Sequence, residues 1–364
     1  MKSEPVRVLV VDDSAFMRRA LSRMLERDAD IAVIATAKDG EEAVELTRRL
    51  RPDVVTLDVE MRGLGGLGAL RLITAEAHGE VAVIMVSSYT TRGARITLEA
   101  LQIGAADFIA KPGADAGTRE IGALGDELIE KVRACAPVKK NGDAQTVSSV
   151  AASRQPPSGV ECIGIGTSTG GPVALSTLLP RLPNDFPAPI VIAQHMPPGF
   201  TAALAERLNS ASSIEVREGA DGTPLSAGVA VVAPAGTHAR LRRDGPAVRL
   251  ALERAEPRTL TPSVDVLFNS LADVFGKHAM GVILTGMGHD GVEGLRSLQA
   301  SGAYTAGQDE ATCTIYGMPR AAALAGVLDC VVPLPELPRL LCRVTGLGVP
   351  LQWQEGSRPP KPGT

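Results

Sequence analysis

The sequence lacks several features that mark particular classes of protein. Its five cysteines are an odd number, lie far apart and form no Cys-x-x-Cys pair, which argues against a disulfide framework or a structural zinc site. No apolar run reaches the roughly 18 residues of a membrane span, and the opening MKSEPVRVLVVDD has no signal-peptide hydrophobic region. We therefore expect reduced core thiols, no membrane insertion and a cytoplasmic location.

An excess of positive charge is also missing. The formal net charge of -4 argues against nucleic acid as the main partner. The 364 residues, 45% of them hydrophobic, suffice for two or three domains. Residues 134–159, ACAPVKKNGDAQTVSSVAASRQPPSG, are polar and show no periodicity, so they predict a flexible linker between domains at 1–133 and 160–350. Residues 351–364 have the same character and predict a disordered tail.

Both halves of the chain alternate apolar runs with amphipathic segments. In the first half the predicted strands are residues 6–11, 31–35, 53–57, 81–86 and 107–110, and the amphipathic segments include 14–27, 41–50 and 92–103. In the second half the predicted strands are residues 162–166, 189–193, 229–233, 280–284 and 327–332. This alternation predicts two α/β domains, each a doubly wound parallel sheet.

Carboxylates follow the predicted strands of the first domain. Asp12 and Asp13 come after the first strand and Asp58 after the third, and the carboxyl ends of parallel strands share one edge of the sheet. Three carboxylates in one crevice repel each other, so we expect a hard divalent cation there and choose Mg²⁺. Ser87 and Lys111 follow the last two strands, which suits a phosphoryl transfer to Asp58. The alternative is that each aspartate merely caps a helix.

Four segments of the first half resemble the response-regulator receiver domain: VLVVDDS, VVTLDVEM, IMVSS and GAADFIAKP. The resemblance covers residues 5–133 and implies a flavodoxin-like fold that is phosphorylated. It assigns Mg²⁺ binding to Asp12, Asp13 and Asp58, phosphorylation to Asp58, the switch hydroxyl to Ser87, the switch aromatic to Phe108 and phosphate contact to Lys111. The family usually continues after Glu60-Met61 with a proline and then an aspartate before glycine, whereas this chain has Arg62 and Gly65, which bears on loop rigidity and phosphate lifetime.

The segment GIGTSTGGP, residues 164–172, opens the second domain. A dinucleotide fingerprint needs glycine where Thr169 stands, and a Walker loop needs a lysine that the segment lacks. Gly-x-Ser-x-Gly at residues 166–170 does fit a nucleophile elbow, which would project Ser168 from a strand-to-helix turn and aim helix N–H groups at developing negative charge. A glycine-serine loop with no catalytic role is an alternative that fits this segment equally well.

A serine nucleophile needs a base and a carboxylate to orient it. His195 ends the strand PIVIAQ at the same predicted edge as Ser168, while His238 in PAGTHARL and His289 in a glycine loop remain candidates. Asp290 follows the strand at 281–285 and is the candidate acid. The alternatives are a structural histidine at a strand end and an aspartate that caps the helix starting near residue 291.

Four segments of the second half resemble the catalytic domain of the chemotaxis protein-glutamate methylesterase (CheB-type): GTSTGGP, QHMPPGFT, LTGMGHDG and QDEATCTIYGMPRAA. The resemblance covers about residues 160–345. It implies a Rossmann-like α/β sheet, a triad of Ser168, His195 and Asp290, and oxyanion residues Thr169 and Met287, with no cofactor. The implied substrates are γ-glutamyl methyl esters, and in many members glutamines, on chemoreceptors.

The same resemblance implies a phosphodonor and a switch. The donor would be a chemotaxis histidine kinase, and the unphosphorylated receiver would pack over the catalytic face. Two alternatives stay open: a receiver-controlled transcription factor, against which the second half shows no basic recognition helix, and a scaffold in which Ser168 does not catalyse. Salt-dependent DNA binding would favour the first, and inactivity on methylated receptor the second.

Overall fold

The computed structural model describes residues 4–77, 79–88, 90–111, 118–136, 154–255 and 260–348. The chain divides into two compact units, Met1–Gln145 and Thr146–Thr364. Most of the predicted linker and the whole predicted tail at 351–364 lie outside the described residues, and the finer domain boundaries at 133 and 160 stay predictions. Each unit is described by itself.

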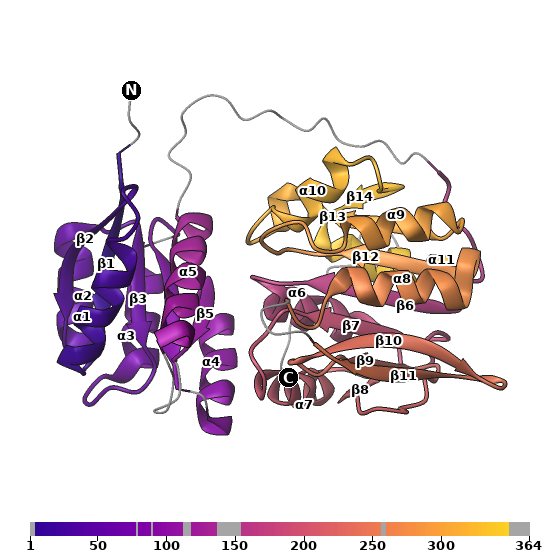
Figure 1. The fold of residues 1–364 in the computed structure, drawn as a ribbon, viewed down its shortest axis with the longest axis horizontal. Helices are drawn as coiled ribbons and strands as arrows, with labels where there is room; N and C mark the ends of the chain where they lie inside the picture. The colour runs from indigo at the N-terminus through magenta and orange to yellow at the C-terminus, as the bar shows by residue number, and fades with distance from the viewer. Residues whose placement is uncertain are drawn as a thin grey trace. The chain divides into compact units, whose positions relative to one another are not determined.

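The first unit contains a five-stranded parallel sheet in the order β2-β1-β3-β4-β5 (Figure 1). Its strands are β1 Val6–Val11, β2 Ile31–Ala37, β3 Val54–Asp58, β4 Ala82–Ser87 and β5 Asp107–Ala110. Its helices are α1 Ala15–Leu25, α2 Gly40–Leu50, α3 Gly65–Ala77, α4 Thr91–Ile103 and α5 Thr118–Cys135. All five predicted strands are present, with ends shifted by at most two residues, and the doubly wound fold is confirmed.

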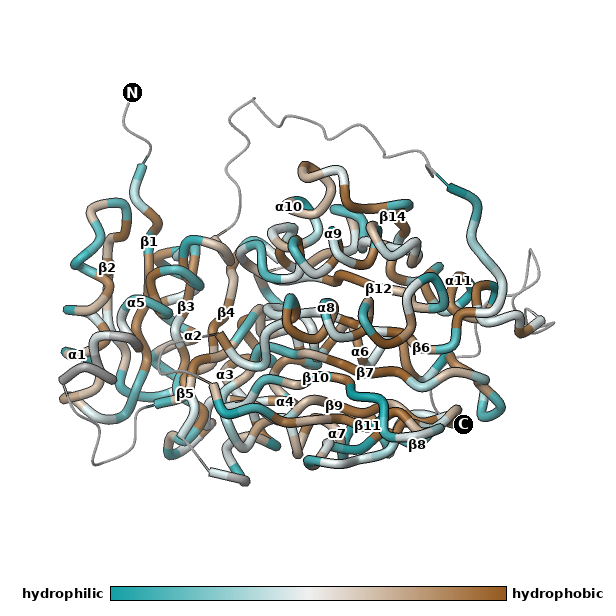
Figure 2. Tube along the Cα trace, turned by 45° about the vertical axis from the view of Figure 1, so that its right-hand side comes forward, coloured by the Kyte–Doolittle hydropathy of each residue, from teal (hydrophilic) through white to brown (hydrophobic). Residues whose placement is uncertain are grey.

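Local sequence explains why these helices begin where they do. The side chains of Ser14, Asp39 and Thr90 accept hydrogen bonds from backbone amides in the first turns of α1, α2 and α4. Helix α1 packs against α5, while α3 packs against α2 and α4. The inner strands β1, β3 and β4 are mostly buried apolar runs, which is typical of parallel sheets, and β3 and β4 appear largely brown in Figure 2. The edge strand β2 is mostly half-buried.

The second unit contains a seven-stranded parallel sheet in the order β14-β13-β12-β6-β7-β9-β8 and a separate antiparallel hairpin of β10 and β11 (Figure 1). The strands are β6 Cys162–Thr167, β7 Ile190–Gln194, β8 Glu215–Glu218, β9 Val229–Val232, β10 Thr237–Asp244, β11 Ala247–Arg254, β12 Ala279–Ile283, β13 Tyr304–Gln308 and β14 Cys330–Val332. The α-helices are α6 Gly171–Leu178, α7 Phe200–Ala211, α8 Val264–Phe275, α9 Val292–Ala300, α10 Met318–Leu324 and α11 Leu337–Val344, and the 3₁₀ turns are η1 Leu179–Arg181, η2 Gly276–His278, η3 Glu310–Thr312 and η4 Leu334–Glu336. The prediction of a second doubly wound sheet is confirmed.

The five strands predicted for this unit are all present, but four others were missed. Strand β8 reads EVRE and lies at the sheet edge, where charged residues are common, so it carries no apolar run. Strand β13 reads YTAGQ, which is buried yet weakly apolar. Strands β10, THARLRRD, and β11, AVRLALER, mix arginines with apolar residues irregularly, so neither forms an apolar run.

The chain order in this sheet changes direction at β6. The strands that follow β6 directly extend the sheet on one side, while β12, β13 and β14 extend it on the other. The switch point therefore lies between β6 and β12, and in open α/β sheets ligands bind beyond the carboxyl ends of the strands at such a point. Helix α8 lies close over this place: a Cβ on Gly166 would come 2.2 Å from Val264 Cγ1, so only glycine permits the approach.

Two expectations from the composition concern the whole chain. No helix among the described residues is both long enough and apolar enough to cross a membrane. All five cysteines are free; Cys162, Cys330 and Cys342 are buried, whereas Cys135 and Cys313 are half-buried. The expectation of core thiols therefore holds fully for only three of them.

Candidate functional site

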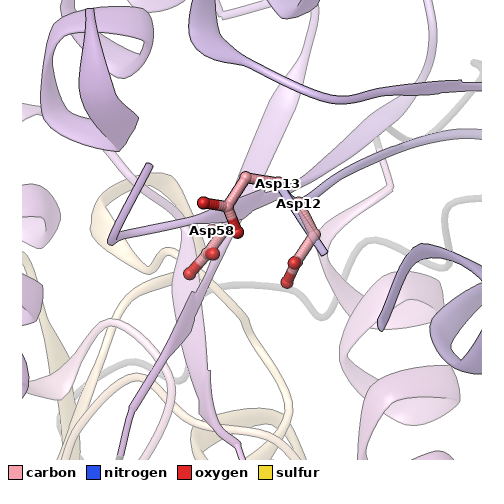
Figure 3. Close-up of side chains that lie close together, drawn as sticks. All are labelled: Asp12, Asp13 and Asp58. Carbon is pink, nitrogen blue, oxygen red and sulfur yellow. The ribbon is translucent and has the colours of Figure 1, made fainter. Parts of the chain in front are cut away.

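The three predicted carboxylates of the first unit lie together at one edge of its sheet. Asp12 and Asp13 follow β1 and Asp58 ends β3, and these strands are neighbours. One oxygen from each carboxylate lies within 4.8 Å of the other two (Figure 3). Asp12 and Asp58 are buried, at 0% and 2% exposure, while Asp13 is exposed. The cluster is thus a buried pair with one member open to solvent.

Lys111 lies against the buried pair. Its Nζ is 2.8 Å from Oδ2 of Asp12 and 2.8 Å from Oδ2 of Asp58. Burial raises the pKa of Asp58 to about 6, and the Asp12 charge adds to the rise, although Lys111 opposes it. The Lys111 ammonium therefore does not fully offset the negative charge of the carboxylates and the cost of burying it.

The oxygen atoms of this cluster suit a divalent cation. The buried Oδ2 of Asp12 makes no hydrogen bond of acceptable geometry, although the Lys111 ammonium is close by. Carboxylate oxygens that converge in this way are the ligands that hard divalent ions prefer. The residues present thus fit a Mg²⁺ ion.

Ser87 lies at the same edge of the sheet. It ends β4, whose Val86 is in register with Asp58, and its carbonyl accepts a hydrogen bond of 2.6 Å from the Lys111 amide. The Ser87 side chain is fully buried. Phe108 instead lies within β5, with 4% exposure, and the Lys131 ammonium is 5.3 Å from its ring centre. The structure therefore brings Ser87 and Lys111 to the carboxylates and leaves Phe108 in the core.

The loop after Asp58 contains the departure from the receiver pattern. Arg62 is exposed, and α3 begins at Gly65. The loop is held without the usual proline, because Leu64 N donates to Glu41 Oε1 at 3.0 Å and Glu60 N donates to Asp58 Oδ1 at 3.2 Å. One of these anchors is Asp58, the predicted site of phosphorylation.

Ser168, His195 and Asp290 follow three neighbouring strands of the second unit. Thr167 of β6 is in register with Gln194 of β7, so Ser168 and His195 are the next pair beyond the strands. His195 N donates to Thr167 O at 3.0 Å, and neighbouring strands are about 5 Å apart. Asp290 lies in the loop after β12, on the other side of β6.

The imidazole and the carboxylate are in direct contact. His195 Nε2 is 2.8 Å from Asp290 Oδ2, and the two side chains are 7% and 13% exposed. An ionised carboxylate only accepts hydrogen bonds, so Nε2 carries the proton in the neutral imidazole. Nδ1 is then the ring nitrogen with the lone pair for a base.

Asp290 is held by the first turn of α8. Its Oδ1 accepts from Ser263 Oγ at 3.0 Å and from Asp265 N at 3.0 Å, and its Oδ2 accepts from Val264 N at 2.7 Å. Burial alone would raise the pKa of Asp290, but His195 and these amides outweigh it and lower the pKa to about 2. The carboxylate is therefore ionised at any pH at which the imidazole is a base.

The alternative role considered for Asp290 was wrong. Helix α9 has Gly291 as its N-cap and no side-chain cap, so Asp290 does not cap the helix that follows it. It binds instead to the start of α8, about 26 residues earlier in the chain. Sequence reasoning missed these contacts between Asp290 and the start of α8, although Ser263 before the apolar segment VDVLF is a helix-start signal.

Thr169 and Met287 lie in the two loops that border Ser168. Thr169 is buried at 5% exposure, and its carbonyl accepts from Thr285 Oγ1 at 2.9 Å. Met287 follows Gly286, where an added Cβ would lie 2.7 Å from Ser168 Cβ. The loop after β12 thus passes directly beside the serine, and both predicted oxyanion residues are its neighbours in the structure.

The other histidines are placed differently. His238 Nδ1 accepts a long hydrogen bond of 3.4 Å from Ser263 N, and the Ser263 hydroxyl in turn contacts Asp290. His289 is exposed. His278 precedes β12, at the opposite end of the sheet, and His78 lies outside the described residues. Among the described histidines, His195 is therefore the one that contacts a carboxylate and follows a strand next to that of Ser168.

Comparisons with known proteins match each of the two units to a protein family. Residues 163–341 match the family model described as CheB methylesterase, and residues 8–120 match that of the response regulator receiver domain. A protein-glutamate methylesterase/protein-glutamine glutaminase of Symbiobacterium thermophilum is 42% identical over 363 residues, covering 94% of this chain and 98% of the relative. One of Archaeoglobus fulgidus is 43% identical over 345 residues, covering 93% and 97%.

A solved structure also resembles the second unit. The CheB methylesterase catalytic domain of Thermotoga maritima is 37% identical, with a TM-score of 0.50, and the match covers 51% of this chain and 98% of that one.

Proposed function

The chain belongs to the protein-glutamate methylesterase/protein-glutamine glutaminase family, and from that premise we propose which of its residues carry the reaction and its control. It is a phosphorylation-regulated hydrolase that demethylates chemoreceptor glutamates and deamidates chemoreceptor glutamines. The observation that carries the residue assignment is the contact of His195 Nε2 with Asp290 Oδ2, beside Ser168 at the switch point of the sheet.

Ser168 is the proposed nucleophile. Its Oγ attacks the ester carbonyl while Nδ1 of His195 takes its proton, and Asp290 stabilises the imidazolium that forms. Collapse of the tetrahedral intermediate gives the proton to the departing methoxide, so methanol leaves and an acyl-enzyme remains. Water then attacks the acyl carbonyl with His195 again as base. The bond from the acyl carbon to Ser168 Oγ breaks, the imidazolium returns the proton to Oγ, and the receptor keeps a glutamate side chain.

Deamidation uses the same residues. A glutamine carbonyl takes the place of the ester carbonyl, and ammonia leaves instead of methanol. The proposed oxyanion donors are backbone N–H groups around Thr169 and Met287, since both loops border Ser168. Donors fixed in a folded loop need no reorganisation as the charge develops.

The receiver is the proposed control element. Asp58 accepts the phosphoryl group, Lys111 and Ser87 contact its oxygens, and Phe108 is the switch aromatic. Asp12, Asp13 and Asp58 would hold Mg²⁺, which neutralises the charge of the phosphoryl group when bound. Lys111 already neutralises part of the charge on Asp12 and Asp58, which keeps the acceptor aspartate available as an anion.

The partners and the boundaries follow from this function. The phosphodonor is a chemotaxis histidine kinase, the substrates are methyl-accepting chemoreceptors, and nucleic acid has no role. The enzyme works in the cytoplasm, with a receiver over residues 1–133, a linker over 134–159 and a catalytic domain over 160–350. Phosphorylation of Asp58 raises the activity of the catalytic domain.

The deciding experiment measures methanol release from methylated chemoreceptor. The parent chain, Ser168→Ala and Asp58→Asn are each assayed with and without a small phosphodonor and Mg²⁺. We expect no release above background from Ser168→Ala, stimulated release from the parent, and unstimulated release from Asp58→Asn. Equal release by the parent and Ser168→Ala would remove Ser168 from the mechanism, and a parent that ignores the phosphodonor would remove the switch.

A further inference from the structure

Gln194 is the last residue of β7 and directly precedes His195. Its side chain is 1% exposed. Its Nε2 donates to Ser168 O at 2.9 Å and to His195 O at 3.0 Å. One amide group therefore joins the backbone of the proposed nucleophile to the backbone of the proposed base.

The orientation of this amide is determined by its neighbours. Both contacts on the Nε2 side are carbonyl oxygens, so only the NH₂ end can face them, and a flipped amide would place oxygen against oxygen. Oε1 is buried and makes no hydrogen bond within the described residues. A buried acceptor without a partner costs stability, on the order of 1–3 kcal/mol in general, so packing must hold it there.

Gly171 provides that packing. A Cβ on Gly171 would lie 2.0 Å from Gln194 Oε1, so the first residue of α6 must be glycine for the amide to fit. The amide is thus enclosed between the start of α6 and the two carbonyls, where it cannot rotate away.

The contact with Ser168 O has a consequence for the next peptide group. In a trans peptide the C=O and the following N–H point in opposite directions. Ser168 O points to the buried Gln194 and also accepts from Gly171 N at 2.8 Å. The N–H of Thr169 is therefore directed away from Gln194. The Gln194 contacts set the direction of a proposed oxyanion donor as well as the spacing of Ser168 and His195.

We propose that Gln194 is a positioning residue for the hydrolysis, because its amide fixes the nucleophile turn and the histidine loop in their relative register. The proposal rests on the proposed function for its kinetic effect. Catalytic groups must be held to within about 0.5 Å, and a misplacement of about 1 Å can cost about 100-fold in rate. Gln194 itself touches neither the substrate nor the reacting atoms.

The kinetic test uses the full chain with phosphodonor and Mg²⁺ present. Gln194→Met keeps the length of the side chain but removes both donors. We expect its kcat for methanol release to fall at least 10-fold with KM within 3-fold of the parent. The pH at which kcat/KM is half-maximal should stay in place, because the contact of His195 with Asp290 is intact. A kcat within twofold of the parent would overturn the proposal.

A matched control separates positioning from general destabilisation. Thr305 on β13 is likewise fully buried, and its hydroxyl donates to Asp329 Oδ2 at 3.2 Å and accepts from Asp329 N. Thr305→Val removes these buried hydrogen bonds away from the site. We expect it to lower the unfolding midpoint as Gln194→Met does while keeping kcat within twofold. An equal loss of kcat in both variants would reduce the role of Gln194 to stability, which contradicts the proposal.

Two further measurements keep the test decisive. If Gln194→Met fails to fold, Gln194→Glu replaces it: only the protonated carboxyl donates, so its kcat relative to the parent should rise as the pH falls, and a constant ratio near one would contradict the proposal. Hydrogen exchange of residues 164–172 tests the contact without any assay of activity. Faster exchange there in the variant supports the proposal even if Ser168→Ala refutes the esterase, and unchanged exchange counts against it.

Discussion

At the scale of residues, Asp58 and Asp290 show how environment decides protonation. The pKa of Asp58 rises to about 6 because burial and the Asp12 charge outweigh one lysine. The Asp290 side chain is only 13% exposed, yet its pKa falls to about 2 because an imidazole, a hydroxyl and two helix amides contact it. Around Asp58, additional positive charge would stabilise the ionised carboxylate. Around Asp290, the hydrogen-bond donors already stabilise the ionised carboxylate.

Asp290 should matter for stability as well as for activity. Its folded pKa of about 2 lies below the ordinary 3.8, so it stabilises the fold above about pH 4 and the contribution is lost as the pH falls towards 2. We expect about 2 kcal/mol at neutral pH. In Asp290→Asn, urea unfolding of the catalytic unit should depend less on pH between 4 and 2, and kcat should fall by orders of magnitude. The same acid dependence in variant and parent would contradict the assignment.

At the scale of elements, the start of α8 takes part in the proposed triad. The helix approaches β6 closely because Gly166 leaves room for Val264, and its first turn supplies the amides that hold Asp290. A helix N-terminus favours negative charge there. The position of α8 therefore helps to hold the proposed acid, Asp290, as an anion.

Ser263 both caps helix α8 and contacts Asp290 of the proposed triad. Its Oγ accepts from Val266 N as the N-cap of α8 and donates to Asp290 Oδ1. We expect Ser263→Ala to cost about 1 kcal/mol of stability and to lower kcat several-fold, because Asp290 loses one of its donors. Asp39→Ala is the control: it removes the N-cap of α2 in the other unit and should leave kcat unchanged. Equal kcat in parent and Ser263→Ala, with stability reduced, would limit Ser263 to capping.

At the scale of the whole molecule, the chain consists of two units, and in each the proposed reacting groups lie at the carboxyl edge of a parallel sheet. The first unit has a core centred on α1, β1 and α5, and the second has its own core around β6 and α8. Separate cores imply that each unit can respond to its own ligand.

Mg²⁺ should therefore stabilise only the first unit. A ligand that binds the folded state raises stability by about 2.7 kcal/mol at 100 times its dissociation constant. By calorimetry we expect Mg²⁺ to raise one unfolding transition by several degrees and to leave the other in place. Asp13→Asn should abolish the shift, while Asp126→Asn, which removes an exposed acid paired with Arg27, should retain it. A shift in both transitions, or a shift that Asp13→Asn keeps, would refute the proposed ion site.

The sequence by itself predicted the class of both folds and the residues that meet at each edge. Parallel strands that are buried on both faces appear as apolar runs, and their carboxyl ends fall on one edge, so Asp12, Asp58, Ser168 and His195 could be grouped without coordinates. Strands such as β8 and β13 were missed, because an edge strand and a strand of small residues lack that signal.

Only the tertiary structure decided what surrounds these residues. The contacts of Asp290 with the start of α8, the two contacts of Gln194 and the direction of the histidine ring all join segments that are distant in the sequence. Each depends on the distance and angle between particular atoms after packing, and side-chain periodicity carries no such information. Local motifs therefore indicate which side chains are candidates for the reaction. Their protonation states and the directions in which they point depend on how the segments pack together.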